Sequence, residues 1–171
     1  ALKLPYAPTG AQSRTIREIE GDMEQQRPML RLLQGDVGAG KTLVAVMALL
    51  IAVESGAQGA LLAPTEILAR QHHDKLSPLL DQAGVSSLLL TGRDTPAERR
   101  GKLAALASGE AQVAIGTHAL FQDAVQFHRL TLAVIDEQHR FGVRERQRLQ
   151  AKGDPALGGV HLLTMSATPI P

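Results

Sequence analysis

Residues 31–42 read Arg31-Leu32-Leu33-Gln34-Gly35-Asp36-Val37-Gly38-Ala39-Gly40-Lys41-Thr42, and a long apolar run from Leu43 to Val53 follows them. The stretch contains Gly-x4-Gly-Lys-Thr between an apolar segment and a helical pattern, which predicts a phosphate-binding loop between a strand and a helix. Glycines in such a loop allow successive backbone N–H groups to converge on an anion. The start of the following helix offers further free N–H groups and the positive end of its dipole.

The side chains at the end of this stretch predict a nucleotide with a metal ion. Lys41 can reach the β- and γ-phosphates, and the Thr42 hydroxyl can hold Mg²⁺. ATP and Mg²⁺ are therefore the expected cofactors. The predicted nucleotide-binding residues in the loop are Gly35, Asp36, Val37, Gly38, Ala39, Gly40, Lys41 and Thr42.

Composition limits the other possibilities. The 171 residues suit one domain, 44% are hydrophobic, and 18 basic against 17 acidic side chains give a net charge of +1. Bulk charge thus neither predicts nor excludes nucleic acid as a partner. The absence of cysteine excludes disulfides and thiolate metal sites and fits a cytoplasmic location. No apolar run is long enough to span a bilayer, so we expect no membrane partner.

Short apolar segments alternate with helical patterns along the chain. This alternation predicts a doubly wound α/β domain, with a mainly parallel sheet covered by helices on both faces. The expected helices cover residues 10–25, 41–54, 65–80 and 96–107. In the helix over residues 65–80, we expect Ile67, Leu68 and Leu76 on the inner side, toward the sheet. The expected strands cover residues 29–34, 59–63, 88–90, 113–116, 130–135 and 161–165.

A second group of reactive side chains follows one of the expected strands. Leu132-Ala133-Val134-Ile135 leads directly into Asp136-Glu137-Gln138-His139. Adjacent carboxylates at the end of a buried strand are costly unless a cation or hydrogen bonds compensate them. Because ligands bind at the carboxyl ends of parallel strands, we expect Asp136 to bind Mg²⁺ and Glu137 to act as general base toward the attacking water. Lys41, Asp136 and Glu137 are thus the predicted catalytic residues.

Five blocks together resemble the motor domains of superfamily 2 helicases, and more closely those of the RecG family of bacterial ATP-dependent DNA helicases. The blocks are residues 34–42, 63–69 (Ala-Pro-Thr-Glu-Ile-Leu-Ala), 116–120 (Gly-Thr-His-Ala-Leu), 136–143 (Asp-Glu-Gln-His-Arg-Phe-Gly-Val) and 168–171 (Thr-Pro-Ile-Pro). The resemblance implies a RecA-like lobe that couples ATP hydrolysis to movement on duplex DNA and to remodelling of branched DNA in repair and recombination. Transcription-repair coupling translocases share much of the pattern and are the nearest alternative.

The resemblance also assigns roles to individual residues. Gln12 matches the glutamine that reads adenine in this family. Ser166, Ala167 and Thr168 match the motif that couples hydrolysis to movement on DNA, and His139 would link them to the ATP site. The segments that contact the DNA backbone correspond to Pro64, Thr65 and Glu66, and to Gly116, Thr117 and His118; residues 91–93 (Thr-Gly-Arg) are a weaker candidate.

Full-length members of this family carry further domains. We therefore expect residues 1–171 to form one N-terminal motor lobe, with a DNA-wedge domain before it and a second motor lobe after it. That second lobe would supply an arginine finger, which nothing here evidently provides. The family would place the protein in the bacterial cytoplasm or nucleoid.

Two alternatives from other classes remain at this stage. One is a nucleotide-dependent module that binds a protein partner, and the other is a small-molecule kinase with a phosphate-binding loop. The basic segment with Arg140, Arg144, Arg146 and Arg148 could contact DNA or a neighbouring domain, although a solvated helix face explains it equally well. The histidines (His72-His73, His118, His128 and His161) show no metal-ligand spacing, so we expect no zinc site.

Overall fold

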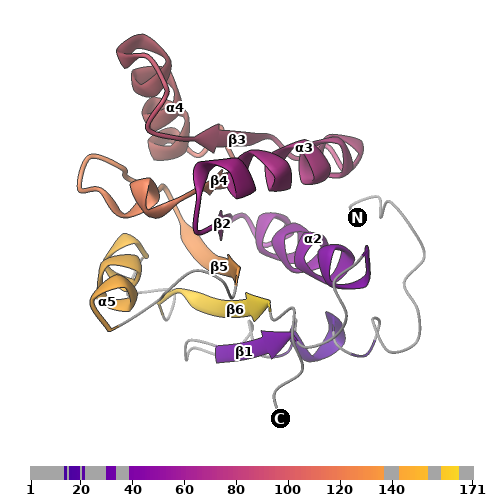
Figure 1. Cartoon of the computed structure of the whole chain (residues 1–171). Coiled ribbons are helices and arrows are strands. Elements are labelled where there is room, and N and C mark those ends of the chain that lie inside the picture. The colour runs from indigo at the N-terminus through magenta and orange to yellow at the C-terminus, as the bar shows by residue number, and fades with distance from the viewer. Residues whose placement is uncertain are drawn as a thin grey trace.

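The computed structural model describes residues 14, 16–19, 21, 30–33, 39–136, 143–153 and 159–165. Six strands within these residues form one sheet, in the order β1-β6-β5-β2-β4-β3, and every neighbouring pair is parallel (Figure 1). The predicted doubly wound α/β fold is thereby confirmed. The strands are β1 (Leu30–Leu33), β2 (Gln58–Leu62), β3 (Ser87–Leu90), β4 (Val113–Gly116), β5 (Leu130–Asp136) and β6 (His161–Met165).

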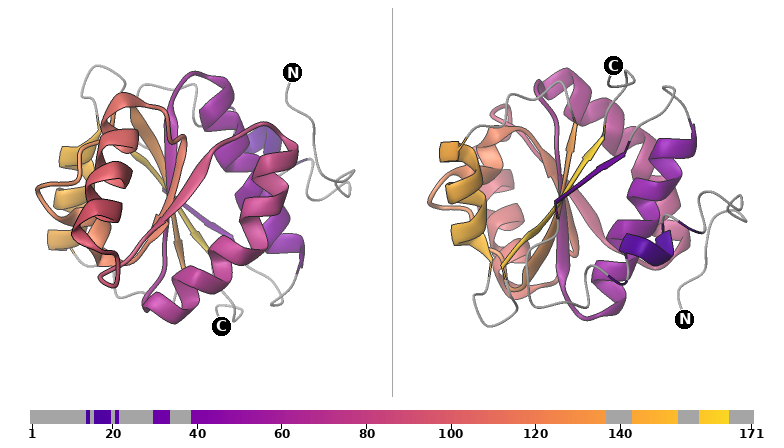
Figure 2. Two further views of the ribbon diagram at one scale, coloured as in Figure 1. Left: turned by 90° about the horizontal axis from the view of Figure 1, so that it is seen from above. Right: turned by 90° about the horizontal axis from the view of Figure 1, so that it is seen from below.

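Helices cover both faces of this sheet. Helices α2 (Ala39–Glu54) and α3 (Glu66–Gln82) lie on one face, while α4 (Pro96–Ser108) and α5 (Val143–Lys152) lie on the other (Figure 2). The chain moves toward β3 through α2 and α3, and it returns toward β6 through α4 and α5. A change of face with each change of direction is what a constant hand of crossover requires.

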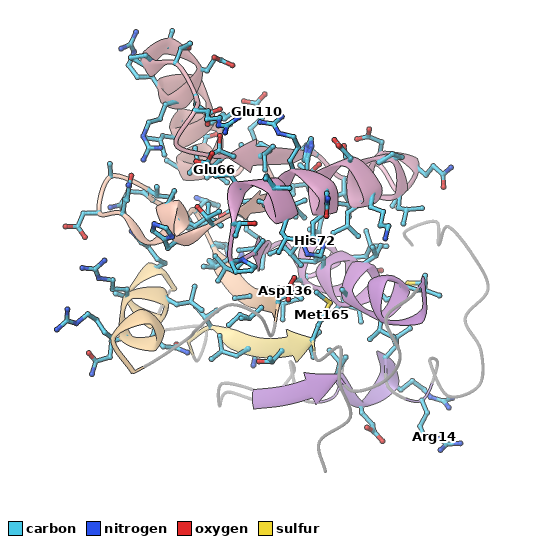
Figure 3. The ribbon with its side chains drawn as sticks, in the orientation of Figure 1. Arg14, Glu66, His72, Glu110, Asp136 and Met165 are labelled. Carbon is cyan, nitrogen blue, oxygen red and sulfur yellow. The ribbon has the colours of Figure 1, made fainter. Side chains whose placement is uncertain are left out.

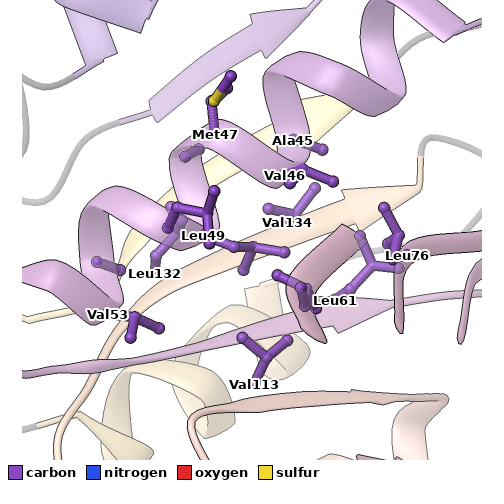
Figure 4. Packing of buried hydrophobic residues seen from close by; sticks show 14 of the residues in the cluster. Ala45, Val46, Met47, Leu49, Val53, Leu61, Leu76, Val113, Leu132 and Val134 are labelled. Carbon is purple, nitrogen blue, oxygen red and sulfur yellow. The ribbon is translucent and has the colours of Figure 1, made fainter. Parts of the chain in front are cut away.

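Two apolar clusters fill the space between the sheet and the helix layers. The strands alternate between them, so that Leu61 of β2 faces α2 and α3, whereas Ala60 and Leu62 face the opposite layer. Figure 4 shows Val46 and Leu49 of α2 packed against Leu61 and Val134 of the sheet. Both faces of the strands are therefore buried, as the continuous apolar segments predict.

Helix α2 is apolar on nearly every side and is buried. Every residue from 43 to 50 is at most 5% exposed. The sheet covers one side of this helix, and α3 and Ile19 belong to the same cluster. The helix is followed by Gly56, whose positive φ of 88° ends the helical geometry as expected of a C-terminal glycine.

The ends of the other helices follow local sequence rules. Thr65 caps α3 by accepting a hydrogen bond from the Leu68 N–H at 3.2 Å. Thr95 caps α4 in a reciprocal pair with Glu98, and Pro96 occupies the first turn. The hydrogen bond that the Thr95 backbone N–H donates to the Glu98 carboxylate, and next a side-chain hydrogen bond with Thr95, lower the pKa of Glu98. Most observed bounds agree with the predicted ones to within about two residues.

One prediction about α3 is wrong. Ile67 does not lie on the inner side of the helix, because 69% of its surface is exposed. The buried residues of α3 are Ala69, Leu76 and Leu80. At roughly 100° per residue, Ile67 lies about 180° around the helix from Leu76, so both cannot face the sheet.

Other predictions concern short or undescribed segments. The expected helix over residues 10–25 is helical at its described residues, where Ile16 is half-buried and Ile19 is buried; the rest lies outside the described residues. The short 3₁₀ helix η1 (His118–Phe121) was not predicted. Among the described residues, no helix combines the length and hydropathy needed to cross a membrane.

Candidate functional site: the carboxyl edge of the sheet

The carboxyl ends of all six strands meet at one edge of the sheet, because every strand pair is parallel. This edge divides into two halves along the strand order. The half formed by β1, β6 and β5 holds the predicted nucleotide motifs. The half formed by β2, β4 and β3 holds the three segments that the sequence suggests for DNA contact.

The phosphate-binding sequence lies between a strand and a helix, as predicted. Strand β1 ends at Leu33, and α2 begins at Ala39, which places Lys41 and Thr42 in the first turn of the helix. Their side chains, residues 34–38 and Gln12 lie outside what the structure describes. An anion at this position would meet the free N–H groups of a sixteen-residue helix whose first turn holds no acidic side chain.

Asp136 is the last residue of β5, where it pairs in register with Met165 of β6. Its side chain is only 16% exposed, and its Oδ2 lies 3.1 Å from Nε2 of His72 on α3 (Figure 3). One strand, β6, separates β5 from β1, so the two motifs are roughly 10 Å apart by strand spacing. The neighbouring predicted residues Glu137 and His139, and residues 166–168, lie outside the described part of the chain.

The chemistry at Asp136 fits Mg²⁺. Within the described residues, no group of three or more acidic or histidine side chains gathers that could enclose a metal ion. Mg²⁺ does not need such a group, since it commonly takes one or two carboxylates and completes its shell with water and substrate phosphates. A single carboxylate at the strand edge, beside a predicted phosphate loop, is compatible with such a shared ion.

The segment from Pro64 to Glu66 joins β2 to α3 and also contacts the loop after β3. The Glu66 carboxylate accepts a hydrogen bond from the Gly92 N–H at 2.9 Å and lies 3.3 Å from Nε of Arg93. Arg93 is 79% exposed, so this ion pair is largely screened by solvent. The contact brings the candidate residues 64–66 and 91–93 together at one place on the edge.

The segment Gly116-Thr117-His118 follows β4, between the other two. Thr117 is 4% exposed and caps η1 by accepting a hydrogen bond from the Ala119 N–H at 3.4 Å. Gly116 lies so close to β3 that an added Cβ would come within 2.6 Å of the Leu90 carbonyl oxygen. Only His118 of the three is exposed. Packing therefore explains the glycine and capping explains the threonine, while His118 remains open to a ligand.

His72 is the residue of this site that sequence reasoning missed. In the sequence it is one of two adjacent histidines on a helix, and nothing in the local pattern connects it with Asp136, which is 64 positions away. The contact could be expected only if the strand order were known. In that order β2, which leads into α3, is the neighbour of β5. Of the basic segment, Arg144 and Arg148 on α5 are exposed, as a solvated helix face predicts.

Comparisons with known proteins agree with this arrangement. The chain is 50% identical over 168 residues to the ATP-dependent DNA helicase RecG of Escherichia coli O157:H7, and 53% identical over 169 residues to that of Bacillus subtilis strain 168. Each match covers 98% of this chain and 24% of the relative, so the chain spans about a quarter of the length of these proteins.

Solved structures give the same result. The structure of RecG bound to a three-way DNA junction matches 98% of this chain and 22% of that chain, with a TM-score of 0.84 and 44% identity. A DEAD box protein from Methanococcus jannaschii has a TM-score of 0.67 at 18% identity over 95% of this chain and 44% of its own, which supports the RecA-like fold alone. The family model for DEAD/DEAH box helicases matches residues 9–171. This chain therefore belongs to the DEAD/DEAH box helicase family.

Proposed function

We propose that this chain is the nucleotide-binding motor lobe of a RecG-type DNA helicase. It would couple ATP hydrolysis to movement on duplex DNA and to the remodelling of branched DNA. The main support is the match to RecG relatives over 98% of this chain, together with the two motif groups that the fold brings to one edge. The transcription-repair coupling alternative is not favoured, because the similar proteins described above are RecG helicases.

The nucleotide half of the edge would bind ATP with Mg²⁺. Lys41 would contact the terminal phosphates, and Thr42 and Asp136 would hold the metal ion, which stabilises charge on the transferring phosphoryl group. Glu137 would accept a proton from the attacking water. Residues 35–40 would supply backbone N–H groups to the phosphates, and Gln12 would contact the adenine.

The other half of the edge would hold the DNA backbone. Residues 64–66 and 116–118 would contact phosphates without reading sequence, in the way that threonine hydroxyls and free N–H groups at helix starts do. The exposed Thr65 hydroxyl accepts a capping bond and keeps its own O–H to donate, whereas in residues 116–118 it is His118 that is exposed. His139, Ser166, Ala167 and Thr168 would transmit hydrolysis to this surface.

The whole motor would need other domains. We propose that residues 1–171 form one lobe, that a second RecA-like lobe supplies the arginine finger, and that a wedge domain separates DNA strands in the bacterial cytoplasm. The share of each RecG relative that this chain covers leaves room for both domains. ATP would bind between the lobes, and opening and closing of that cleft would move them along duplex DNA.

Substitution of the proposed general base tests this function. In a chain extended by a second motor lobe, Glu137→Gln should lower the DNA-stimulated ATPase rate by about 10²-fold or more, while ATP affinity changes little. Glu110→Gln, which changes an exposed glutamate after α4, is the matched control and should retain the wild-type rate. An unchanged rate in Glu137→Gln would contradict the assigned role.

A further inference from the structure

A polar contact between side chains joins the two halves of the carboxyl edge within the described residues. Helix α3 begins beside the candidate DNA-contacting residues, yet its His72 reaches Asp136 in the nucleotide half, with 3.1 Å between Nε2 and Oδ2 (Figure 3). The two strands involved are neighbours, since Leu62 of β2 lies in register with Ile135 of β5. His72 thus extends from α3, the helix that follows β2, to the carboxyl end of the neighbouring strand β5.

The position of His72 is fixed by how α3 packs. Ala69, Leu76 and Leu80 are buried against the sheet, and they hold the helix at that face. His72 follows Ala69 by three residues and precedes Leu76 by four, so it lies on the same side of the helix. Its side chain is 26% exposed. The packing of α3 therefore places most of this side chain under cover, beside the end of β5.

The chemistry of the pair determines which atom donates. An ionised carboxylate has only acceptors, so the proton of this hydrogen bond belongs to Nε2 of His72. A bond of this kind fixes the rotation of the carboxylate, because it selects one of the two oxygens and holds it in place. Carboxylates that bind metal ions are commonly oriented by such outer hydrogen bonds, and loss of the outer partner typically weakens metal binding by about 10–100-fold.

We propose that His72 is a positioning residue for Asp136. Its hydrogen bond to Oδ2 orients the carboxylate toward the Mg²⁺ that accompanies the nucleotide. This inference rests on the proposed function, which supplies the metal ion and the nucleotide. His72 itself contacts neither of them; it acts through Asp136.

The test measures how much Mg²⁺ strengthens nucleotide binding. A fluorescent ADP derivative is titrated into the 171-residue chain with Mg²⁺ and, separately, with a chelator. His72→Ala should reduce the Mg²⁺-dependent gain in affinity by about tenfold or more, while affinity in the chelator stays within about twofold. His73→Ala, the adjacent half-buried residue of the same helix, is the matched control and should behave as wild type.

Two further comparisons separate positioning from a general effect on folding. His72→Gln places an amide N–H where Nε2 lies and should restore most of the Mg²⁺ effect, whereas the shorter His72→Asn should not. In an Asp136→Asn background, His72→Ala should have no further effect, because the residue acts only through that carboxylate. Thermal unfolding shows whether each variant is folded. If His72→Ala does not fold, the comparison of His72→Gln with His72→Asn tests the positioning role.

The outcomes distinguish this inference from the function on which it rests. If Mg²⁺ did not strengthen nucleotide binding by the wild-type chain, both the proposed function and the role of His72 would be overturned. Mg²⁺-dependent binding in wild type that His72→Ala leaves unchanged, or that the Gln and Asn variants affect equally, would overturn the role of His72 alone.

Discussion

Gly116 ends β4 in direct contact with the backbone of β3, and this close approach predicts a large effect of one added methyl group. A Cβ at Gly116 would lie 2.6 Å from the Leu90 carbonyl oxygen and 3.2 Å from Cγ of Leu120. The Leu120 side chain can shift, but the carbonyl cannot, because Leu90 pairs in register with Gly116 within the sheet. Gly116→Ala must therefore move β3 away from β4 or distort the end of β4.

The size of the effect follows from the cost of overpacking. Extra methyl groups in packed interiors typically cost about 1–3 kcal/mol, and an immobile backbone neighbour places Gly116→Ala in the upper part of that range, at about 2–3 kcal/mol. For a domain of this length, about 1 kcal/mol lowers the melting temperature by roughly 2–4 °C. We expect a decrease of roughly 4–12 °C, measured by circular dichroism during heating.

A glycine in an open position provides the matched control. Gly101 lies within α4, and an added Cβ there would meet nothing within 4 Å. Gly101→Ala should raise the free energy of unfolding by about 0.5–1 kcal/mol, because alanine favours the helix and restricts the unfolded chain. If Gly116→Ala melted within about 1 °C of wild type, the close contact between β3 and β4 would be refuted.

Three further predictions concern the core, a helix cap and pH. Leu61→Ala, at a fully buried position of β2, should lower the free energy of unfolding by about 2–5 kcal/mol in urea titrations, and a loss below about 1 kcal/mol would contradict its packing. Thr95→Ala should cost about 1 kcal/mol through loss of the α4 cap, whereas Thr95→Ser should recover most of it. Burial lowers the pKa of His73 below its ordinary 6.5, so the unfolded chain binds a proton first as the pH falls. The free energy of unfolding should therefore decrease as the pH falls from about 6.5 to the lowered pKa. His73→Gln should remove this part of the pH dependence. An unchanged pH profile in this variant would contradict the role of His73.

The sequence predicts the sheet well because each strand is a continuous apolar segment with turn residues at its ends. Strand β4 was predicted at its observed bounds, Val113–Gly116, and α4 at nearly its observed bounds. A threonine cap followed by proline fixes the start of α4 in local terms. Signals of this kind depend only on neighbouring residues, so they can be read without knowing the rest of the fold.

The face that a helix buries is harder to predict from apolar residues alone. Ile67 and Leu76 are both apolar, but nine positions place them on opposite sides of α3. Ile67 therefore lies on the side of α3 that is turned away from its buried face, and 69% of it is exposed. Small Ala69, rather than Ile67, shares the buried face with Leu76 and Leu80.

The candidate site was partly predictable for the same reason. Asp136 was identified because it directly follows an apolar strand, which is a local signal. Its contact with His72 joins residues 64 positions apart and depends on β2 being the neighbour of β5. The burial of Thr117 likewise depends on packing beyond its own segment. Contacts between distant segments are set by strand order, which the sequence pattern leaves open.

ATP hydrolysis with and without forked DNA tests the central proposal most directly. The rate would be measured for the 171-residue chain and for a chain extended by a second motor lobe. In the 171-residue chain we expect slow hydrolysis that DNA does not stimulate, and in the extended chain we expect hydrolysis that DNA stimulates. The reason is that the second lobe would supply the arginine finger and half of the DNA-binding surface. Equal, DNA-independent rates in both would contradict a two-lobe motor and would indicate a self-contained nucleotide hydrolase.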